Sequence, residues 1–124
     1  MPEVRSIQLD SERVPYLNAD ELRAIEESIK EVAENFQSLK RVILYGSKAR
    51  GSYTEDSDVD IMFIFASPVN RHLKNEISDI LFEYEVAYDV ALSALFISED
   101  AFSKKRTPFL NALRVEGIVI WSRQ

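Results

Sequence analysis

The sequence predicts an α+β domain in which helices flank a β-sheet. One observation is size and composition: the chain has 124 residues, of which 46% are hydrophobic and 29% charged, as in a single globular domain. The other is the pattern of apolar residues, which changes between helix-like and strand-like periods along the chain. Residues 1–17 show no clear period and are interpreted as an N-terminal arm, which leaves residues 18–124 as the domain.

The first predicted helix begins at Asn18. Apolar residues recur at steps of three and four from Leu22 to Leu39, which places them on one face of a helix of about five turns. Asn18 and Glu21 have the spacing of a capping box, in which both side chains bind backbone amides at the helix start. The β-branched apolar run at 41–45 then predicts a buried strand that ends at a glycine.

The remaining elements follow from the same two periods and from capping residues. Asn70 is a candidate N-cap, and Thr107-Pro108 followed by Gly117 has the pattern of a helix start and a helix end. The predicted order is a turn-rich segment at 46–57, a strand at 58–65, a helix from 70 to about 84, a strand-like run at 86–97, a helical turn at 98–102, a helix at 107–117 and a short strand at 118–121.

Composition excludes several classes of function. The absence of cysteine excludes disulfide scaffolds, iron–sulfur clusters and thiol catalysis, and a single histidine, His72, excludes a site built from several histidines. Asp and Glu number 21 against 15 Lys and Arg, a net charge of −6 that argues against direct binding of nucleic acid or of an anionic membrane. Neither a signal peptide nor a membrane-length apolar run is recognisable, so a cytoplasmic location is expected.

Asp58 and Asp60 are the first candidates for a functional site. Alternate residues of a strand point to the same face, so both carboxylates share one face of the predicted strand at 58–65. The intervening positions on the opposite face are apolar and are expected to face the core. Oxygen ligands with no histidine or cysteine nearby favour Mg²⁺ or Mn²⁺ over zinc. The pattern therefore predicts a divalent-cation site at the start of this strand.

The turn before these aspartates is suited to an anion. Gly46 allows a sharp turn after the preceding strand, and Ser47 is expected to cap a short helix whose free backbone N–H groups attract negative charge. Lys48 and Arg50 add cationic side chains beside that helix start. The combination favours a polyphosphate together with the cation that a polyphosphate needs.

Asp89 is the candidate for a third carboxylate. It interrupts an apolar run, and strand parity would place it on one face with the small residues Ala91 and Ser93. An ionised carboxylate in an apolar strand is costly without a partner, and a metal ion is one such partner. The alternative is that Asp89 lies at the end of a strand and pairs with a basic residue.

These residues resemble the signature of a known superfamily. Gly46-Ser47, then ten residues, then Asp58-x-Asp60 resembles the DNA polymerase β-type nucleotidyltransferases. The longer pattern, with Lys48, Arg50 and a second glycine before the aspartates, resembles their minimal nucleotidyltransferase (MNT) branch. The resemblance implies a mixed β-sheet with helices packed on it, the polymerase β-like nucleotidyltransferase fold, over essentially the whole chain.

The resemblance also implies a role for each residue. Gly46 and Ser47 would hold the phosphates of ATP, Lys48 or Arg50 would steady the triphosphate, and Asp58, Asp60 and Asp89 would bind two Mg²⁺ ions, which Mn²⁺ can replace. An acceptor hydroxyl would attack the α-phosphorus and pyrophosphate would leave. Asp89 would take the proton of that hydroxyl.

The implied partner is a protein. MNT proteins of this size are often antitoxins paired with HEPN-domain ribonuclease toxins, onto whose tyrosine they transfer AMP. The resemblance thus implies a magnesium-dependent protein adenylyltransferase that acts as an antitoxin, in a homo- or hetero-oligomer. Two alternatives remain: an antitoxin that neutralises its partner by binding alone, and a transferase for a small molecule such as an aminoglycoside. The chain has no room for an acceptor-binding second domain, which favours a protein acceptor.

Overall fold

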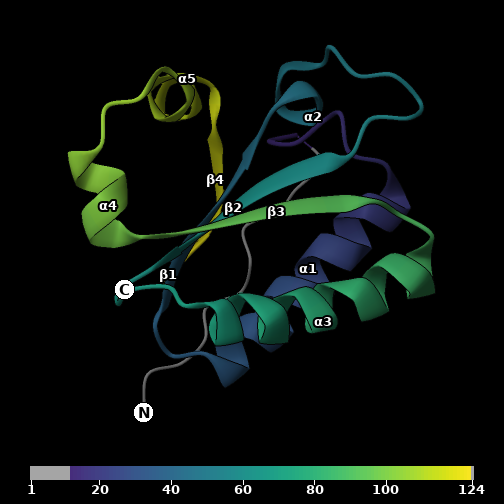
Figure 1. Ribbon diagram of the computed structural model, residues 1–124. Coiled ribbons are helices and arrows are strands. Elements are labelled where there is room, and N and C mark those ends of the chain that lie inside the picture. Colours follow the sequence, from purple (N-terminus) through teal and green to yellow (C-terminus); the bar gives the residue numbers. More distant parts are fainter. Residues whose placement is uncertain (1–11, 124) are drawn as a thin grey trace.

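The computed structural model describes residues 12–123 and contains five helices and four strands within them (Figure 1). In chain order these are α1 (Ala19–Asn35), β1 (Leu39–Tyr45), α2 (Ser47–Arg50), β2 (Val59–Phe65), α3 (Arg71–Tyr88), β3 (Leu92–Ser98), α4 (Glu99–Lys104), α5 (Pro108–Glu116) and β4 (Ile118–Ser122).

The four strands form one mixed sheet in the order β3-β2-β1-β4. β1 pairs antiparallel with both β2 and β4, whereas β2 and β3 are parallel. A parallel pair needs a crossover between its strands, and α3 supplies it. The predicted α+β class with a mixed sheet is therefore confirmed.

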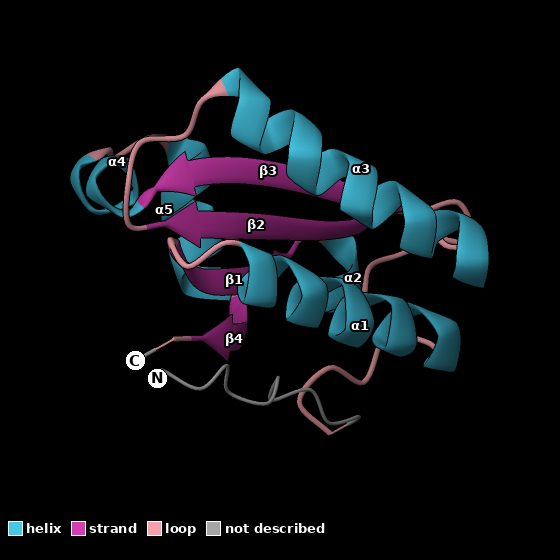
Figure 2. Cartoon of the chain, turned by 90° about the horizontal axis from the view of Figure 1, so that it is seen from below, coloured by secondary structure: helices cyan, strands magenta, loops and turns pink. Residues whose placement is uncertain are grey.

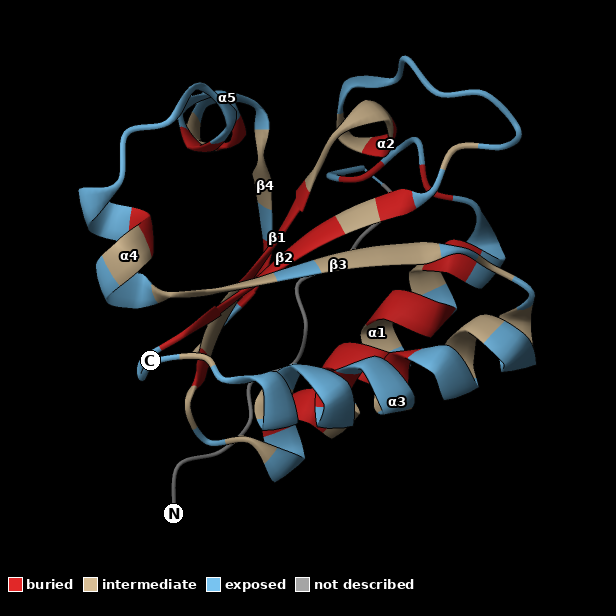
Figure 3. Ribbon diagram, viewed as in Figure 1, coloured by how far each residue is buried: buried red, intermediate tan, exposed pale blue. Residues whose placement is uncertain are grey.

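Helices α1 and α3 pack side by side on one face of the sheet (Figure 2). Every second residue of β2 turns to this face and is buried, and the apolar stripes of the two helices meet them. The buried residues of this layer that come from β2, α1 and α3 are Val59, Ile61, Phe63, Phe65, Ile25, Ile29, Val32, Ala33, Ile77 and Leu81. Figure 3 shows this burial along β1, β2 and the inner side of α1.

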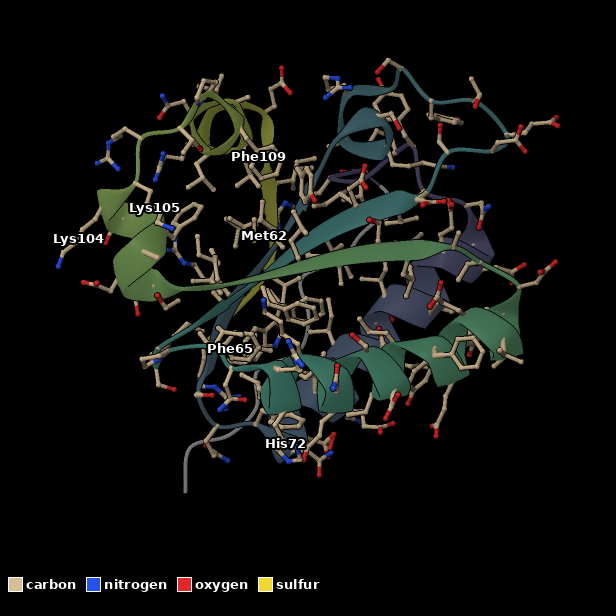
Figure 4. All side chains as sticks on the ribbon, in the orientation of Figure 1. Met62, Phe65, His72, Lys104, Lys105 and Phe109 are labelled. Atoms are coloured by element: carbon tan, nitrogen blue, oxygen red, sulfur yellow. The ribbon has the colours of Figure 1, made fainter. Side chains whose placement is uncertain are left out.

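The other face of the sheet is covered only in part, by α4 and α5. Met62 and Ile64 of β2 pack there against Phe102 of α4 and Leu110 and Leu113 of α5. Figure 4 shows Met62 and Phe109 on this side, whereas Phe65 lies toward α3. Val59 and Ile61, the neighbours of Asp60 along β2, face α1 and α3. Asp60 therefore points to the opposite face of the sheet, the one that α4 and α5 partly cover. The start of β2 thus presents a carboxylate on the sheet face opposite α1 and α3.

Three predicted helix starts are confirmed by their capping residues. The Glu21 amide donates to the Asn18 side chain at 2.8 Å and the Asn18 amide donates to the Glu21 carboxylate at 2.9 Å, so the capping box is formed. Asn70 and Thr107 also cap their helices. The first helix ends earlier than its apolar stripe predicts, because Leu39 belongs to β1.

The strand-like run predicted at 86–97 is wrong in its first part. Helix α3 continues through Tyr88, Asp89 is its C-cap, and β3 begins only at Leu92. A short apolar run does not distinguish a helix from a strand, and contacts between α3 and α1 decide the outcome here. The Tyr84 hydroxyl donates to Glu31 at 2.6 Å, and the Tyr88 hydroxyl donates to Glu27.

The α1–α3 layer also carries the excess negative charge of the chain. Its two helices contain ten Asp and Glu residues and four Lys and Arg residues, a difference equal to the net charge of the sequence. The rest of the sequence is balanced in charge.

Two residues of the expected N-terminal arm lie in the core. Val14 and Leu17 are buried in the same cluster as the α1 and α3 side chains. The part of the arm at 1–11 lies outside the described residues. Across the described chain, no helix has both the length and the apolar character that crossing a bilayer requires.

Candidate active site

Asp60 and the Gly46 turn meet because β1 and β2 are antiparallel. Tyr45, the last residue of β1, pairs with Asp60 near the start of β2. Gly46 follows at once with φ +77°, and a Cβ placed on it would collide with the Asp60 carboxylate. Only glycine combines this conformation with this close approach. The structure therefore brings the predicted phosphate turn and one of the predicted metal-ligating carboxylates together.

The surroundings of Asp60 act on its charge in opposite directions. Partial burial raises the pKa of Asp60, and the neighbouring Asp58 carboxylate raises it further. The Arg50 guanidinium and a hydrogen bond from Ser93 lower that pKa. Burial and the charge of Asp60 raise the pKa of Tyr45 to about 12. Asp58 is exposed just before β2 and Asp60 is only partly buried, so neither carboxylate lies in the core.

The turn that follows Gly46 is a single helical turn, α2. Gly46 is its N-cap, and its carbonyl accepts from the amides of Ala49 and Arg50 at 3.1 Å. The prediction that Ser47 caps this helix is wrong, since Ser47 is its first residue and no side chain caps it. A glycine cap suffices because the positive φ of Gly46 turns the chain directly out of β1. The Ser47 side chain is left without a capping role.

Lys48 has a different environment from the one predicted. Its ammonium lies 3.1 Å from the Glu21 carboxylate, and both side chains are only 8% exposed. It also lies 4.1 Å from the centre of the Tyr53 ring. Because Glu21 belongs to the capping box of α1, Lys48 ties the α2 turn to the start of that helix. The structure thus buries the charge of Lys48 in an ion pair with Glu21.

Arg50 is the exposed cation of the turn. It donates to the Ser52 hydroxyl at 3.3 Å and pairs with Glu116, at the end of α5, at 3.2 Å. Both side chains of that pair are nearly half exposed, so water can replace either partner at little cost. Arg50 is also near enough to Asp60 to lower the pKa of that carboxyl.

Asp89 is not placed as predicted. It is the exposed C-cap of α3, with φ 53° and ψ 53°, and lies three residues before β3. Within residues 12–123 no three Asp, Glu, His or Cys side chains gather as a metal-binding group. The structure brings Asp58 and Asp60 together at the start of β2 and leaves Asp89 outside this group.

A pocket of about 800 Å³ lies next to this site. It is bounded by the start of α1, the loop at 53–57 and the connection from α3 to β3, and Lys48 and Asp89 are among its lining residues. Asp58 and Asp60 do not line it. Asp89 and Lys48 therefore share a cavity beside the carboxylate pair rather than completing it.

Sequence reasoning missed three contributors to the site. Ser93 bonds to Asp60, Glu21 holds Lys48, and Glu116 pairs with Arg50. The sequence does signal Glu21, whose capping-box spacing places it at the start of α1. Ser93 and Glu116 meet their partners only through the register of β3 and the position of α5, which no local pattern encodes.

A glycine turn, a carboxylate pair and a mixed sheet in this arrangement define a nucleotidyltransferase-type domain. The chain belongs to the nucleotidyltransferase domain family, whose sequence profile matches residues 25–115. The prediction of a nucleotidyltransferase is thus confirmed at the level of the family.

Named relatives agree with that assignment. Two proteins of Methanocaldococcus jannaschii, both named "Putative protein adenylyltransferase", are each 32% identical to this chain. One match covers 69% of this chain and 82% of the relative, and the other covers 66% and 79%.

Solved structures show the same fold. The structure of a "putative nucleotidyltransferase" from Sulfolobus solfataricus has a TM-score of 0.58 at 22% identity, and the match covers 82% of this chain and 79% of that one. A toxin–antitoxin structure with AMP-PNP has a TM-score of 0.60 at 20% identity, covering 86% and 76%. A structure of the tri-AMPylated HEPN toxin of Shewanella oneidensis with MNT antitoxin has a TM-score of 0.53 at 18% identity, covering 85% and 74%.

Proposed function

We propose that this protein transfers AMP from ATP to a tyrosine hydroxyl of a partner HEPN toxin and thereby acts as its antitoxin. The observation that carries the proposal is the contact between the Gly46 turn and Asp60, because it joins a phosphate-binding backbone to a carboxylate pair. The relatives named as protein adenylyltransferases and the solved complex with an AMPylated HEPN toxin support the choice of AMP and of a protein acceptor.

The residues at the site fit one divalent cation. Asp58 and Asp60 lie two residues apart at the start of β2 and offer only oxygen donors, which suit Mg²⁺ or Mn²⁺. When bound, such a cation would neutralise phosphate charge and orient the triphosphate. Gly46 and Ser47 would present the turn to the phosphates, and Arg50 would exchange Glu116 for a phosphate oxygen. Lys48 would stabilise the turn through its ion pair with Glu21.

The transfer itself is an in-line displacement. The acceptor oxygen forms a bond to the α-phosphorus while the bond from that phosphorus to the bridging oxygen of the β-phosphate breaks. Pyrophosphate leaves with the electron pair, and the proton of the acceptor hydroxyl is released to water. The contribution of the protein is to position the triphosphate and the acceptor, since binding geometry alone can supply a large part of such an acceleration.

A label-transfer assay tests the proposal. The protein is incubated with α-labelled ATP, Mg²⁺ and a purified HEPN protein, and the label on the HEPN band is measured. We expect labelling by the wild type, loss of labelling in Asp58→Asn and Asp60→Asn, and unchanged labelling in Asp56→Asn. Asp56 is a matched control because it is an exposed loop aspartate two residues before the pair. Full labelling by Asp60→Asn would exclude the mechanism.

An antitoxin that works by contact alone is the second candidate. The observation that favours it is that Asp89, the predicted third carboxylate, lies outside the pair formed by Asp58 and Asp60. In that case no label appears, yet the aspartate variants still bind and neutralise the HEPN protein. Label on an added aminoglycoside, with no effect on the HEPN protein, would instead support the small-molecule alternative.

A further inference from the structure

The register of β2 and β3 identifies the residues that neighbour the two aspartates. Asp60 pairs with Ser93, and the amide of Val59 donates to the carbonyl of Ala91 at 2.9 Å. Residues in register on parallel strands point to the same side, so Ser93 lies beside Asp60 on one face. Asp58 and Ala91 directly precede the first pair of this register, Val59 and Leu92, and continuing the register by one residue places Ala91 next to Asp58.

Neither neighbour carries a carboxylate. Ala91 is exposed and has only a methyl group, and the Ser93 hydroxyl is engaged with Asp60. Asp89, two residues before Ala91, is held in the left-handed C-cap of α3, where its amide donates to the Glu85 carbonyl. A change of pairing that brought Asp89 to the place of Ala91 would break this cap and shift β3 by two residues against β2.

We propose that the site holds a single divalent cation together with the nucleotide, because the β3 side of the aspartate pair offers Ala91 and Ser93 and neither brings a third carboxylate to share a second ion. This inference rests on the proposed function. Two divalent cations held close together repel each other, and bridging negative charge is what makes such a pair stable. With two carboxylates and the phosphates, the chain supplies ligands for one octahedral Mg²⁺.

The proposal also concerns the acceptor proton. With Ala91 in this position, β3 supplies no carboxylate to take that proton, and it leaves to water. Transfer by the wild type is therefore expected to be slow. A carboxylate introduced at position 91 would supply both a ligand for a second ion and a base, and a well-positioned base typically contributes about a hundredfold or more.

The test counts bound Mn²⁺ in the presence of saturating AMP-PNP, by the paramagnetic resonance of the free ion after equilibrium dialysis. The wild type is expected to bind one Mn²⁺ per chain, and Ala91→Asp is expected to bind two. Ala66→Asp is the matched control, since it adds the same charge at an exposed residue just past the other end of β2, and it is expected to bind one. The transfer rate of Ala91→Asp is expected to rise by roughly tenfold or more.

The outcomes separate this inference from the proposed function. Two Mn²⁺ per wild-type chain would overturn the inference and leave the proposed function in place, as would an unchanged count in a folded Ala91→Asp variant. Failure of every variant to bind AMP-PNP would overturn both. If circular dichroism showed that Ala91→Asp does not fold, the wild-type count alone would still decide between one ion and two.

Discussion

Lys48 and Arg50 lie two residues apart in the same turn, yet their side chains have different environments and therefore different expected roles. Lys48 is buried in an ion pair with Glu21, whereas Arg50 faces solvent and pairs with the exposed Glu116. Both residues are plausible phosphate ligands by sequence pattern, because both are cations next to a glycine turn. The difference depends on the position of α1 behind the turn, which the local sequence does not encode.

Substitution of these two residues should therefore separate stability from nucleotide binding. Lys48→Met leaves Glu21 buried without its partner and is expected to lower the free energy of unfolding by about 3 kcal/mol. Arg50→Met breaks only an exposed pair and is expected to change that free energy by less than about 1 kcal/mol, but to raise the KM for ATP. Urea unfolding and steady-state kinetics measure the two effects, and a stable Lys48→Met variant with a raised KM would reverse the assignment.

At the scale of elements, the junction of α3 and β3 separates what the sequence encodes from what it does not. Local capping residues mark three helix starts, at Asn18, Asn70 and Thr107, and these starts are correctly predicted. The end of α3 is not correctly predicted, because the apolar pattern of its last turn fits the start of a strand equally well. Hydrogen bonds from Tyr84 and Tyr88 to glutamates of α1 hold that turn in the helix.

The Tyr84 contact predicts a dependence of stability on pH. The hydrogen bond to Glu31, with burial and nearby negative charge, raises the pKa of Tyr84 from 10.0 to about 12. The folded protein therefore holds the phenol proton more tightly than the unfolded chain does. The resulting stabilisation is complete below about pH 10 and is lost as the pH rises through about 12.

Comparison of the wild type with Tyr84→Phe isolates this effect. At neutral pH the variant is expected to be less stable by about 1 kcal/mol, since it lacks the hydrogen bond. The difference should shrink as the pH rises from about 10 to about 12, because Tyr84 ionises in the unfolded chain while it still holds its proton in the folded protein. Tyr45, whose pKa is also raised to about 12, is present in both proteins and cancels from the difference. A difference that stays constant with pH in chemical denaturation would contradict the prediction.

At the scale of the whole molecule, the sequence predicts the class of fold and the proximity of the Gly46 turn to Asp60, but not the position of Asp89. Alternation along β2 identifies the buried face, and the spacing from Gly46 to Asp58 and Asp60 identifies the family. The predicted position of Asp89, in contrast, relies on strand parity over a segment that is helical in the structure. Such a long-range assignment fails with any error in an element boundary, because one residue of shift reverses the face.

Binding of the nucleotide should also stabilise the molecule as a whole. AMP-PNP with Mn²⁺ at a hundredfold excess over the dissociation constant is expected to raise the free energy of unfolding by about 2.7 kcal/mol. The increase should be absent in Asp58→Asn/Asp60→Asn and retained in Asp56→Asn, which differs by the charge of a neighbouring aspartate alone. Thermal melting with and without ligand measures it. Equal stabilisation of all three proteins would place the nucleotide elsewhere on the surface.

The unequal distribution of charge has a consequence for how ligands arrive. Ten acidic and four basic residues in α1 and α3 make one side of the molecule negative, whereas acidic and basic residues balance in the rest of the sequence. The folded chain is thus an electric dipole, and an approaching charged body is turned before it makes contact. A cationic surface is drawn toward α1 and α3, and an anionic nucleotide is repelled from them. The encounter with a cationic surface should slow as the ionic strength rises, because salt shortens the reach of the field to about 8 Å at physiological concentration.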